Sequence, residues 1–501
     1  MFLIPPAGSE VRVRAFPVPV ETRACGRPVR RSPRIRRHVV AAALLGFLSP
    51  VLAQAPLPSN EPGDFLREPP KPASIKGNFK LVAIGDLLYS HPLAGSADPE
   101  LQKVFQLTRS GDLTIGNREG AFLDLKTFSG SPYGEGLLWG EALLGRDMKA
   151  IGVGLVSVAN NHATDWGWEG LRESLHLLDE AGIAYAGGGR DLTAAREAGF
   201  VETPKGRVGL ISTASTFKPN AGANDALDEV PGRPGISILR TRAVHLITVE
   251  QLAMIRRLAV ERATPLEPAP APTATELEFG GQQYRLADKP GLHYEMDLYD
   301  EAGLIKAVRD AKQQADLVVF TIHAHESATG LDDDTPEPPD FLVKLFHEAV
   351  DAGADEIVGG GPHSLRGIEI YKGRLVLYGI GAFFIRGEIK APQESVFHVY
   401  PDAGGHAPPP KPPERSVRPG GNPASWYDGL VVTAEFEGGR AKVVRLYPLD
   451  TGNTYEPARR GIPHLADPAY AHRILSYLQQ ASAQFGTRIS IEGSVGVIRI
   501  P

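Results

Sequence analysis

The sequence predicts a layered α/β fold, and three observations support this expectation. The chain has 501 residues, 42% of them hydrophobic, so it can bury one large core or two ordinary ones. Short apolar runs typical of buried strands alternate with longer amphipathic runs typical of helices. Polar residues gather where several apolar runs stop, and ligands bind at such strand ends in open α/β sheets.

The first half of this alternation contains strands, a helix and a hairpin. The helix is expected at 167–182, where Leu171, Leu175 and Leu178 fall on one face. The strands are expected at 78–86, 111–119, 152–162 and 183–189, and the hairpin at 201–212. This order is the β-α-β rhythm of a layered α/β domain.

The second half continues in the same way. Helices expected at 301–315 and 341–352 lead into strands at 316–323 and 355–363, and a hairpin follows at 368–384. Residues 426–501 are expected to complete the domain, with a hairpin at 429–449, a helix around 469–483 and a last strand at 494–500. The main domain is therefore expected at 79–400.

Proline-rich segments interrupt this pattern. Residues 56–78 are expected to form a tether, and 400–425 an exposed loop. A further insertion is expected at about 260–280, where 263–276 is rich in proline and is predicted to be a loop or lid.

The first 55 residues differ from the rest in charge and pattern. Arginines precede an apolar run from Val39 to Leu48, and small residues that suit a signal peptidase follow it. The run is too short to span a membrane. We expect an N-terminal extension with a cleaved secretory signal, and hence a periplasmic or extracellular protein; an uncleaved membrane anchor is the alternative.

Charge and cysteine content exclude several classes of function. Residues up to Ala53 hold nine arginines and two glutamates, so the remainder carries a net charge of −13 against −6 for the whole chain. Such an acidic protein is not expected to bind nucleic acid. The single cysteine, Cys25, excludes a disulfide framework and any cysteine-based metal site in the main domain.

Polar residues at the ends of the predicted strands form the candidate site. Singly, each is explained by a turn, a cap or a satisfied polar residue, but together at one sheet edge they favour a functional site. They are Asp86, Asn117, Glu119, Asn160, Asn161, His162, His323, His325, Glu326 and His363. Carboxylates and imidazoles bind divalent metals, and such a metal lowers the pKa of bound water toward roughly 7, so the set points to hydrolysis.

At these residues the sequence resembles the CapA family of capsule and poly-γ-glutamate synthesis proteins, whose domain resembles calcineurin-like metallophosphoesterases. The resemblance runs from about Lys80 to Phe384. Its motifs are "IGDLLYSHPL", "GDLTIGNREGAF", "SVANNHATDWGWEG", "TIHAHE" and "GPHSLRGIEIYKGRLVLYGIGAFF". It implies a layered α/β/β/α metallophosphatase-like sandwich that carries one or two divalent ions, namely Mn, Zn, Fe or Mg.

The resemblance also implies a role for each residue of the motifs. The implied metal ligands are Asp86, Glu119 (bridging two ions), Asn161, His323, His325 and His363. The implied catalytic residue is His162, as the acid facing the substrate. The position of Asp165 after the motif separately predicts this residue at the catalytic site, as a helix cap or an orienting group. Glu326 would orient a ligand, Trp166 is the preferred tryptophan for a substrate cleft, and Asn160 shapes the turn.

The chain departs from the family pattern at two positions. Gly360 stands where relatives carry histidine, and Ala382 where they carry asparagine. Three function classes stay open, and a plain solute-binding protein is the least favoured because a binding cleft has little need for histidines and carboxylates at several strand ends. The other two are as follows. The first is an exported metal-dependent hydrolase of a phosphoester, an amide or γ-glutamyl bond, or a glycan. The alternative is a non-catalytic accessory subunit of a membrane synthesis complex. In both, the expected partner is an anionic, glycan or peptide envelope polymer or its precursor.

Overall fold

The computed structural model describes residues 73–133, 137–263, 271, 274–330, 335–390, 424–456 and 458–501. The expected signal segment at 1–55, most of the tether and nearly all of the loop at 400–425 lie outside the described residues. Among the helices that are described, none is long and apolar enough to cross a membrane. Export and the proposed domain limits stay predictions.

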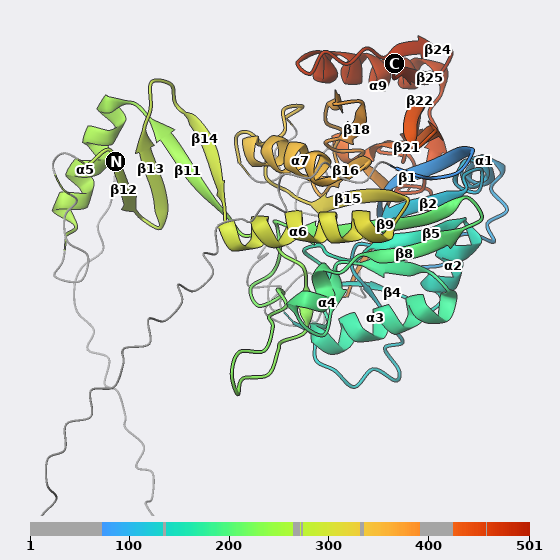
Figure 1. The fold of residues 1–501 in the computed structure, drawn as a ribbon, viewed down its shortest axis with the longest axis horizontal. Helices are drawn as coiled ribbons and strands as arrows, with labels where there is room; N and C mark the ends of the chain where they lie inside the picture. Colours follow the sequence, from blue (N-terminus) through green and yellow to red (C-terminus); the bar gives the residue numbers. More distant parts are fainter. Residues whose placement is uncertain are drawn as a thin grey trace, which may run out of the picture. The chain divides into compact units, whose positions relative to one another are not determined.

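The first sheet joins strands from both ends of the sequence. Its strands in spatial order are β24 (Ser490–Glu492), β25 (Val495–Arg499), β22 (Arg440–Asp450), β21 (Asp428–Glu437), β1 (Asn78–Tyr89), β2 (Leu113–Asn117), β5 (Val153–Ser157) and β6 (Ala184–Ala186). Two further strands join it, β19 (Ala382–Arg386) beside β1 and β23 (His464–Leu465) beside β22. Figure 1 shows β21 lying next to β1, with which it pairs in antiparallel register.

The second sheet contains most of the remaining long strands. Its spatial order is β17 (Ile368–Tyr371), β18 (Arg374–Leu377), β16 (Glu356–Gly360), β15 (Leu317–His323), β9 (Gly206–Ala214) and β8 (Gly199–Thr203). The central pairs β9–β15, β15–β16 and β16–β18 are parallel. The hairpins predicted at 201–212 and 368–384 are present as β8–β9 and β17–β18.

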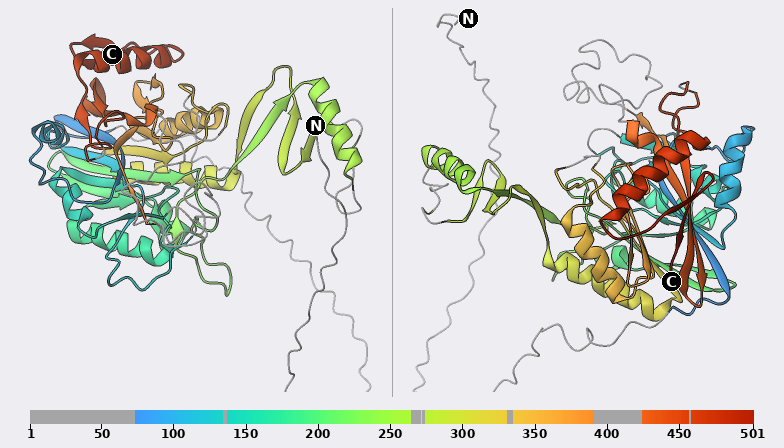
Figure 2. Two further views of the ribbon diagram at one scale, coloured as in Figure 1. Left: turned by 180° about the vertical axis from the view of Figure 1, so that it is seen from behind. Right: turned by 90° about the horizontal axis from the view of Figure 1, so that it is seen from above.

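The two sheets pack face to face between layers of helices (Figure 2). Leu81 and Ile115 of the first sheet share one hydrophobic core with Leu210 and Val319 of the second. Helices α1 (Pro99–Thr108), α2 (Leu144–Ala150) and α3 (Gly167–Ala181) cover the other face of the first sheet, and α6 (Leu298–Gln314) and α7 (Asp340–Ala352) that of the second. This arrangement confirms the expected α/β/β/α layering.

Smaller elements connect these layers. The strands β3 (Ala121–Phe122), β4 (Leu137–Gly140) and β20 (Glu388–Lys390) form a short sheet, and β7 (Gly188–Gly189) pairs with β10 (Gly235–Ile236). Helix α4 (Leu192–Arg196) follows β7, η3 (Ala424–Tyr427) precedes β21, and α9 (Pro468–Ala483) packs against β22 and β17.

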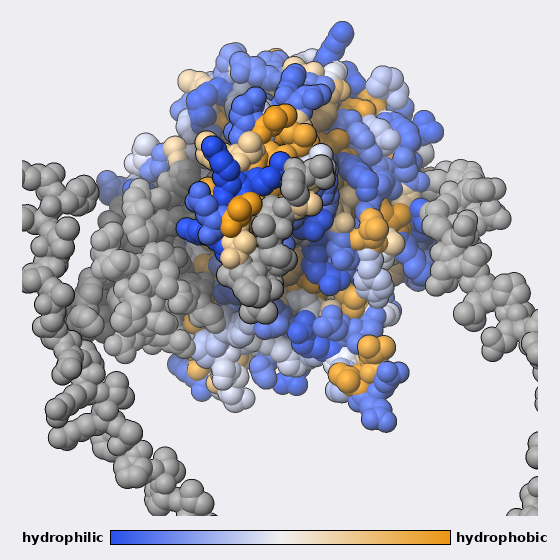
Figure 3. All heavy atoms as spheres, turned by 90° about the vertical axis from the view of Figure 1, so that its left-hand side faces the viewer, coloured by the Kyte–Doolittle hydropathy of each residue, from blue (hydrophilic) through white to orange (hydrophobic). Residues whose placement is uncertain are grey.

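A small additional sheet occupies the region where an insertion was expected. It consists of β12 (Glu276–Phe279), β13 (Gln282–Leu286), β11 (Thr241–Ile247) and β14 (Gly291–Met296), with α5 (Val249–Glu261) against it. This sheet was not predicted; its strand β12 begins at Glu276, the last residue of the loop expected at 263–276. The alternation of Leu277, Phe279, Tyr284 and Leu286 marks a hairpin. Figure 3 looks onto this side of the molecule, where hydrophobic residues lie in several small groups among hydrophilic ones.

Two predicted strand ends also differ from the structure. β1 continues past Asp86 to Tyr89, because Leu87 to Tyr89 pair with β19 after an irregularity at Asp86. β5 ends at Ser157 rather than at His162. The "ANNH" motif therefore lies in the loop between β5 and α3, where its side chains are not constrained to alternate as in a strand.

Candidate metal centre

Five buried side chains from the two sheets meet at one place. Asp86 lies in β1, Glu119 follows β2, His323 ends β15, His325 follows it, and His363 follows β16. Within each sheet the strands concerned are parallel neighbours, so their carboxyl ends lie side by side. These strand-end residues therefore lie together, as the sequence pattern predicted.

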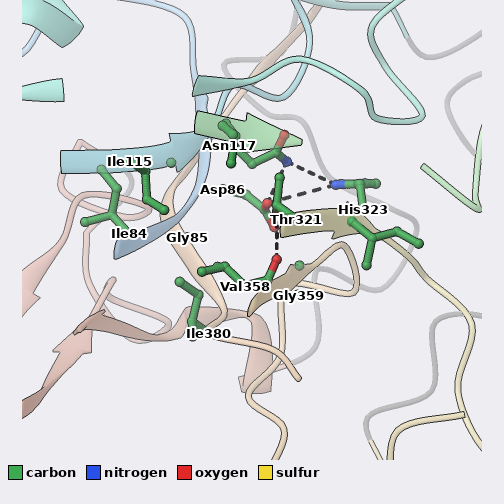
Figure 4. A pocket seen from close by; sticks show the side chains of 14 residues that line it. Ile84, Gly85, Asp86, Ile115, Asn117, Thr321, His323, Val358, Gly359 and Ile380 are labelled. Atoms are coloured by element: carbon green, nitrogen blue, oxygen red, sulfur yellow. Dashed lines mark hydrogen bonds and ion pairs between the residues drawn. The ribbon is translucent and has the colours of Figure 1, made fainter. Parts of the chain in front are cut away.

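Asp86 is held by groups from both sheets. The Nδ1 atom of His363 lies 2.9 Å from its Oδ2, and the Nδ2 amide of Asn117 donates to its Oδ1 at 2.8 Å. Figure 4 shows Asn117 and His323 pointing toward Asp86. Burial alone would raise the pKa of Asp86, but the hydrogen bond and charge of His363 and the charge of His323 lower the pKa to about 2.

Glu119 lies at the centre of the group and is 1% exposed. Within the described residues, neither carboxylate oxygen accepts a hydrogen bond. The closest imidazole nitrogens are Nδ1 of His363 at 3.7 Å and Nε2 of His162 at 3.9 Å. Burial raises the pKa of Glu119. A buried carboxylate with no hydrogen bond is costly unless a cation is coordinated to it.

The three buried imidazoles lie close to one another. The Nε2 atoms of His323 and His325 are 3.1 Å apart, and the ring centroids of His325 and His363 are 5.7 Å apart. Burial, and then the charge of His325, lowers the pKa of His323 well below its usual value. The neutral imidazole that results is the form that binds metals. His363 has a φ of 62°, in the left-handed region that side chains rarely adopt, and such strain is concentrated at functional sites.

The donor atoms form two groups that share Glu119. Asp86, Glu119 and His363 form one, and Glu119, His323 and His325 form the other; within each group the donor atoms lie within 4.8 Å of one another. Carboxylate and imidazole donors suit Mn²⁺, Fe²⁺ or Zn²⁺. Both carboxylate oxygens of Glu119 accept no hydrogen bond from the described residues, so they are available to coordinate one or two divalent ions.

Asn161 lies at the edge of the second group. Its Nδ2 is 3.3 Å from Nε2 of His325, and its buried Oδ1 has no hydrogen-bond partner among the described residues. An amide oxygen of this kind can coordinate a metal without adding charge. The neighbouring Asn160 instead supports the turn, because its amide donates to the Arg118 carbonyl and its Oδ1 accepts from the His162 backbone N–H.

His162 is oriented by a buried carboxylate. Its Nδ1 lies 2.9 Å from Oδ2 of Asp165, so its Nε2 is directed toward Glu119. Asp165 is fully buried and also contacts the Lys218 ammonium at 2.5 Å. The helix-cap prediction for Asp165 is wrong, because α3 begins after Trp166 and the carboxylate makes no bond to its first turn. The sequence analysis missed Lys218, which lies in a loop distant in sequence.

Comparison with known proteins identifies the family. The model of the family described as bacterial capsule synthesis protein PGA_cap matches residues 80–386, more than half of the chain. The chain belongs to this family. The expected CapA resemblance is thereby confirmed, with a role for the family in capsule and poly-γ-glutamate biosynthesis.

Individual relatives differ in how much of the chain they match. An uncharacterized protein of Sinorhizobium fredii is 37% identical over 442 residues, which is 85% of this chain and 94% of that protein. Capsule biosynthesis protein CapA of Bacillus anthracis is 23% identical over 47% of this chain and 41% of its own length. A probable polyglutamine synthesis accessory protein of Mycobacterium tuberculosis is 25% identical over 45% of this chain and 43% of its own length.

The two departures from the capsule-family pattern lie beside Asp86. A Cβ atom built on Gly360 would lie 3.3 Å from Oδ1 of Asp86, so a side chain at this position would face the metal centre. Ala382 is fully buried and lies opposite Asp86 in the β1–β19 register. Neither donor group includes residue 360 or 382, and His325 adds a third imidazole to those of His323 and His363.

Glu326 and Trp166 have surroundings that were not predicted. Oε2 of Glu326 accepts from the hydroxyls of Ser215 and Thr216, and Thr216 in turn accepts from the His325 backbone N–H. Trp166 is buried in a small core cluster, so the prediction that it lines a cleft is wrong.

Trp426 reaches the metal centre from the C-terminal part of the chain. Its ring lies 4.7 Å from that of His363, at an interplanar angle of 73°. It is 7% exposed and therefore forms part of the wall behind this histidine.

Proposed function

We propose that this member of the capsule synthesis family is a metal-dependent hydrolase that acts on an envelope polymer or its precursor outside the cytoplasm. The observation that carries the proposal is the buried Glu119 carboxylate, which accepts no hydrogen bond from the described residues and lies between two groups of metal-binding side chains. When bound, a divalent ion stabilises negative charge on a substrate oxygen and acidifies a water molecule. The proposed substrate bond is a phosphoester, an amide or γ-glutamyl bond, or a glycosidic bond.

The residues of the site would have the following roles. Asp86, Glu119, His323, His325, His363 and Asn161 would hold one or two ions. His162 is partly exposed, and its Nε2 faces the centre. Because Nδ1–H of His162 donates to the Asp165 carboxylate, a proton given to the substrate must come from Nε2 of the doubly protonated imidazolium. In that form His162 would donate its Nε2 proton to the leaving group and become neutral, with Asp165 holding Nδ1–H and the ring orientation.

A non-catalytic accessory role is the second candidate, and Gly360 favours it. The imidazole missing at this position lowers the number of donors near Asp86 and leaves the first group with one histidine. In this case the metal centre would bind an envelope polymer within a membrane synthesis complex without cleaving it. The Mycobacterium tuberculosis relative is named a probable accessory protein, which is consistent with this alternative.

Metal content and turnover, measured on the same preparations, test the proposal. Wild type, Glu119→Gln and the control Glu356→Gln would be loaded with Mn²⁺ or Zn²⁺, dialysed and subjected to elemental analysis. Glu356 is also a buried glutamate, but it lies in β16 away from the imidazoles. We expect wild type and the control to retain metal and Glu119→Gln to lose it.

Turnover of bis(p-nitrophenyl) phosphate and of a γ-glutamyl peptide then separates the two candidates. Hydrolysis that depends on Glu119 and His162 supports the enzyme. Metal retention without hydrolysis of either substrate favours the accessory role. Wild-type protein that retains no metal contradicts both forms of the proposal.

A further inference from the structure

A second cavity borders the metal centre without including its ligands. It has a volume of about 380 Å³, within the range of small-molecule sites. Its wall includes Ser364 and Leu365, which directly follow His363, together with residues of η3, the β21–β22 region and α9. Apart from Ser364 and Leu365, the lining residues lie outside the segment 80–386 that matches the capsule family.

The charges of the wall disfavour an anionic ligand. Asp428 accepts hydrogen bonds from the Arg473 guanidinium at 2.7 Å and from the Tyr470 hydroxyl at 2.6 Å. Asp450, the second carboxylate of the lining, accepts from the Gly452 backbone N–H at 2.7 Å. Two carboxylates and one guanidinium give the lining a net charge of −1, so a polycarboxylate would be repelled.

The remaining lining combines neutral polar groups with aromatic and aliphatic surface. Asn453 and Thr454 offer an amide and a hydroxyl, whereas Tyr477, Leu365 and Ile474 offer apolar surface. A sugar ring matches this combination, because its hydroxyls need such polar partners and its C–H faces pack on tyrosine and aliphatic side chains.

We infer that this cavity binds a neutral sugar residue of a glycan chain next to the metal centre. The inference goes beyond the proposed function and does not depend on it, because the cavity contains none of the proposed metal ligands. A glycan seated here would extend toward His363 along the segment 363–365. The cavity would thus select a carbohydrate-containing polymer over a purely anionic one.

Calorimetric titration of the full chain in EDTA tests this inference independently of metal and turnover. The probes are maltopentaose, cellopentaose and penta-N-acetylchitopentaose, with a γ-glutamyl pentapeptide as the anionic comparison. Thr454→Trp fills the cavity from its exposed rim, and Glu456→Trp is the control, since Glu456 is exposed in the same loop but does not line the cavity.

We expect at least one neutral oligosaccharide to bind, with a dissociation constant at least tenfold weaker in Thr454→Trp and unchanged in Glu456→Trp. Absence of binding by all three oligosaccharides overturns the inference. Binding that Thr454→Trp leaves unaltered, or binding of the γ-glutamyl peptide alone, overturns it as well.

Discussion

Substitution of Glu119 by glutamine should have opposite effects on stability with and without metal. Without metal, the wild-type protein buries a carboxylate that accepts no hydrogen bond, and burial raises its pKa. Leaving such a group unsatisfied costs about 1–3 kcal/mol, or more for a charge. Glutamine has nearly the same shape and no charge, so in EDTA at pH 8 Glu119→Gln should be the more stable protein by about this amount.

Excess metal should reverse the order. An ion present at 100 times its dissociation constant stabilises the folded state by about 2.7 kcal/mol per site. Glu119 belongs to both donor groups, so the substitution removes this gain at both. With two sites the wild type should exceed the variant by roughly 3 kcal/mol, whereas with one site the two should agree to within about 1 kcal/mol.

Urea unfolding followed by tryptophan fluorescence measures both conditions, and Trp426 beside His363 places one reporter at the site. The matched control is Glu356→Gln, in which metal should raise the free energy of unfolding by the same amount as in the wild type. If Mn²⁺ stabilises Glu119→Gln as much as the wild type, or stabilises neither, then the assignment of Glu119 as the shared ligand is wrong.

Three further predictions concern individual side chains. His325→Gln and His363→Gln should each reduce bound metal by one ion of two in elemental analysis, because the residues lie in different donor groups; equal and complete loss would argue against two separate sites. Burial raises the pKa of Glu356 from 4.5 to about 8. The free energy of unfolding of the wild type should therefore fall by roughly 5 kcal/mol as the pH rises between these values. Glu356→Gln should abolish this fall in urea titrations at pH 5 and 8.5. Lys218→Met removes the cation of a buried ion pair and should cost about 2–4 kcal/mol, whereas the exposed Lys306→Met should cost less than about 1 kcal/mol; equal unfolding midpoints for the two would refute the role of the pair.

The sequence was sufficient to predict which side chains lie together at the candidate metal centre. Asp86, Glu119, His323 and His363 each lie in or directly after a predicted strand, and parallel strands end at the same edge of a sheet. The α/β/β/α layering followed from the family resemblance, and the alternation of strands and helices agreed with it. Strand ends were less accurate, since Leu87 to Tyr89 pair with β19, a partner that local sequence does not reveal.

Contacts between distant segments were the part that could not be predicted. Lys218 reaches Asp165 from the loop after β9, and no spacing rule links the two. Trp426 reaches His363 from the opposite end of the chain. The small sheet containing β12 was missed for a different reason. The proline-rich run at 263–276 was interpreted as a loop, and the strands on either side of it were not predicted.

The pairing of β1 with β21 has a consequence for the order of events during synthesis. β1 carries Asp86 and leaves the ribosome early, but β21, which covers one of its edges, and Trp426, which packs against His363, are among the last segments to be translated. On a nascent chain that stops before residue 428, the edge of β1 that β21 covers stays open. The first sheet, and with it the strand that carries Asp86, is therefore completed only late in synthesis.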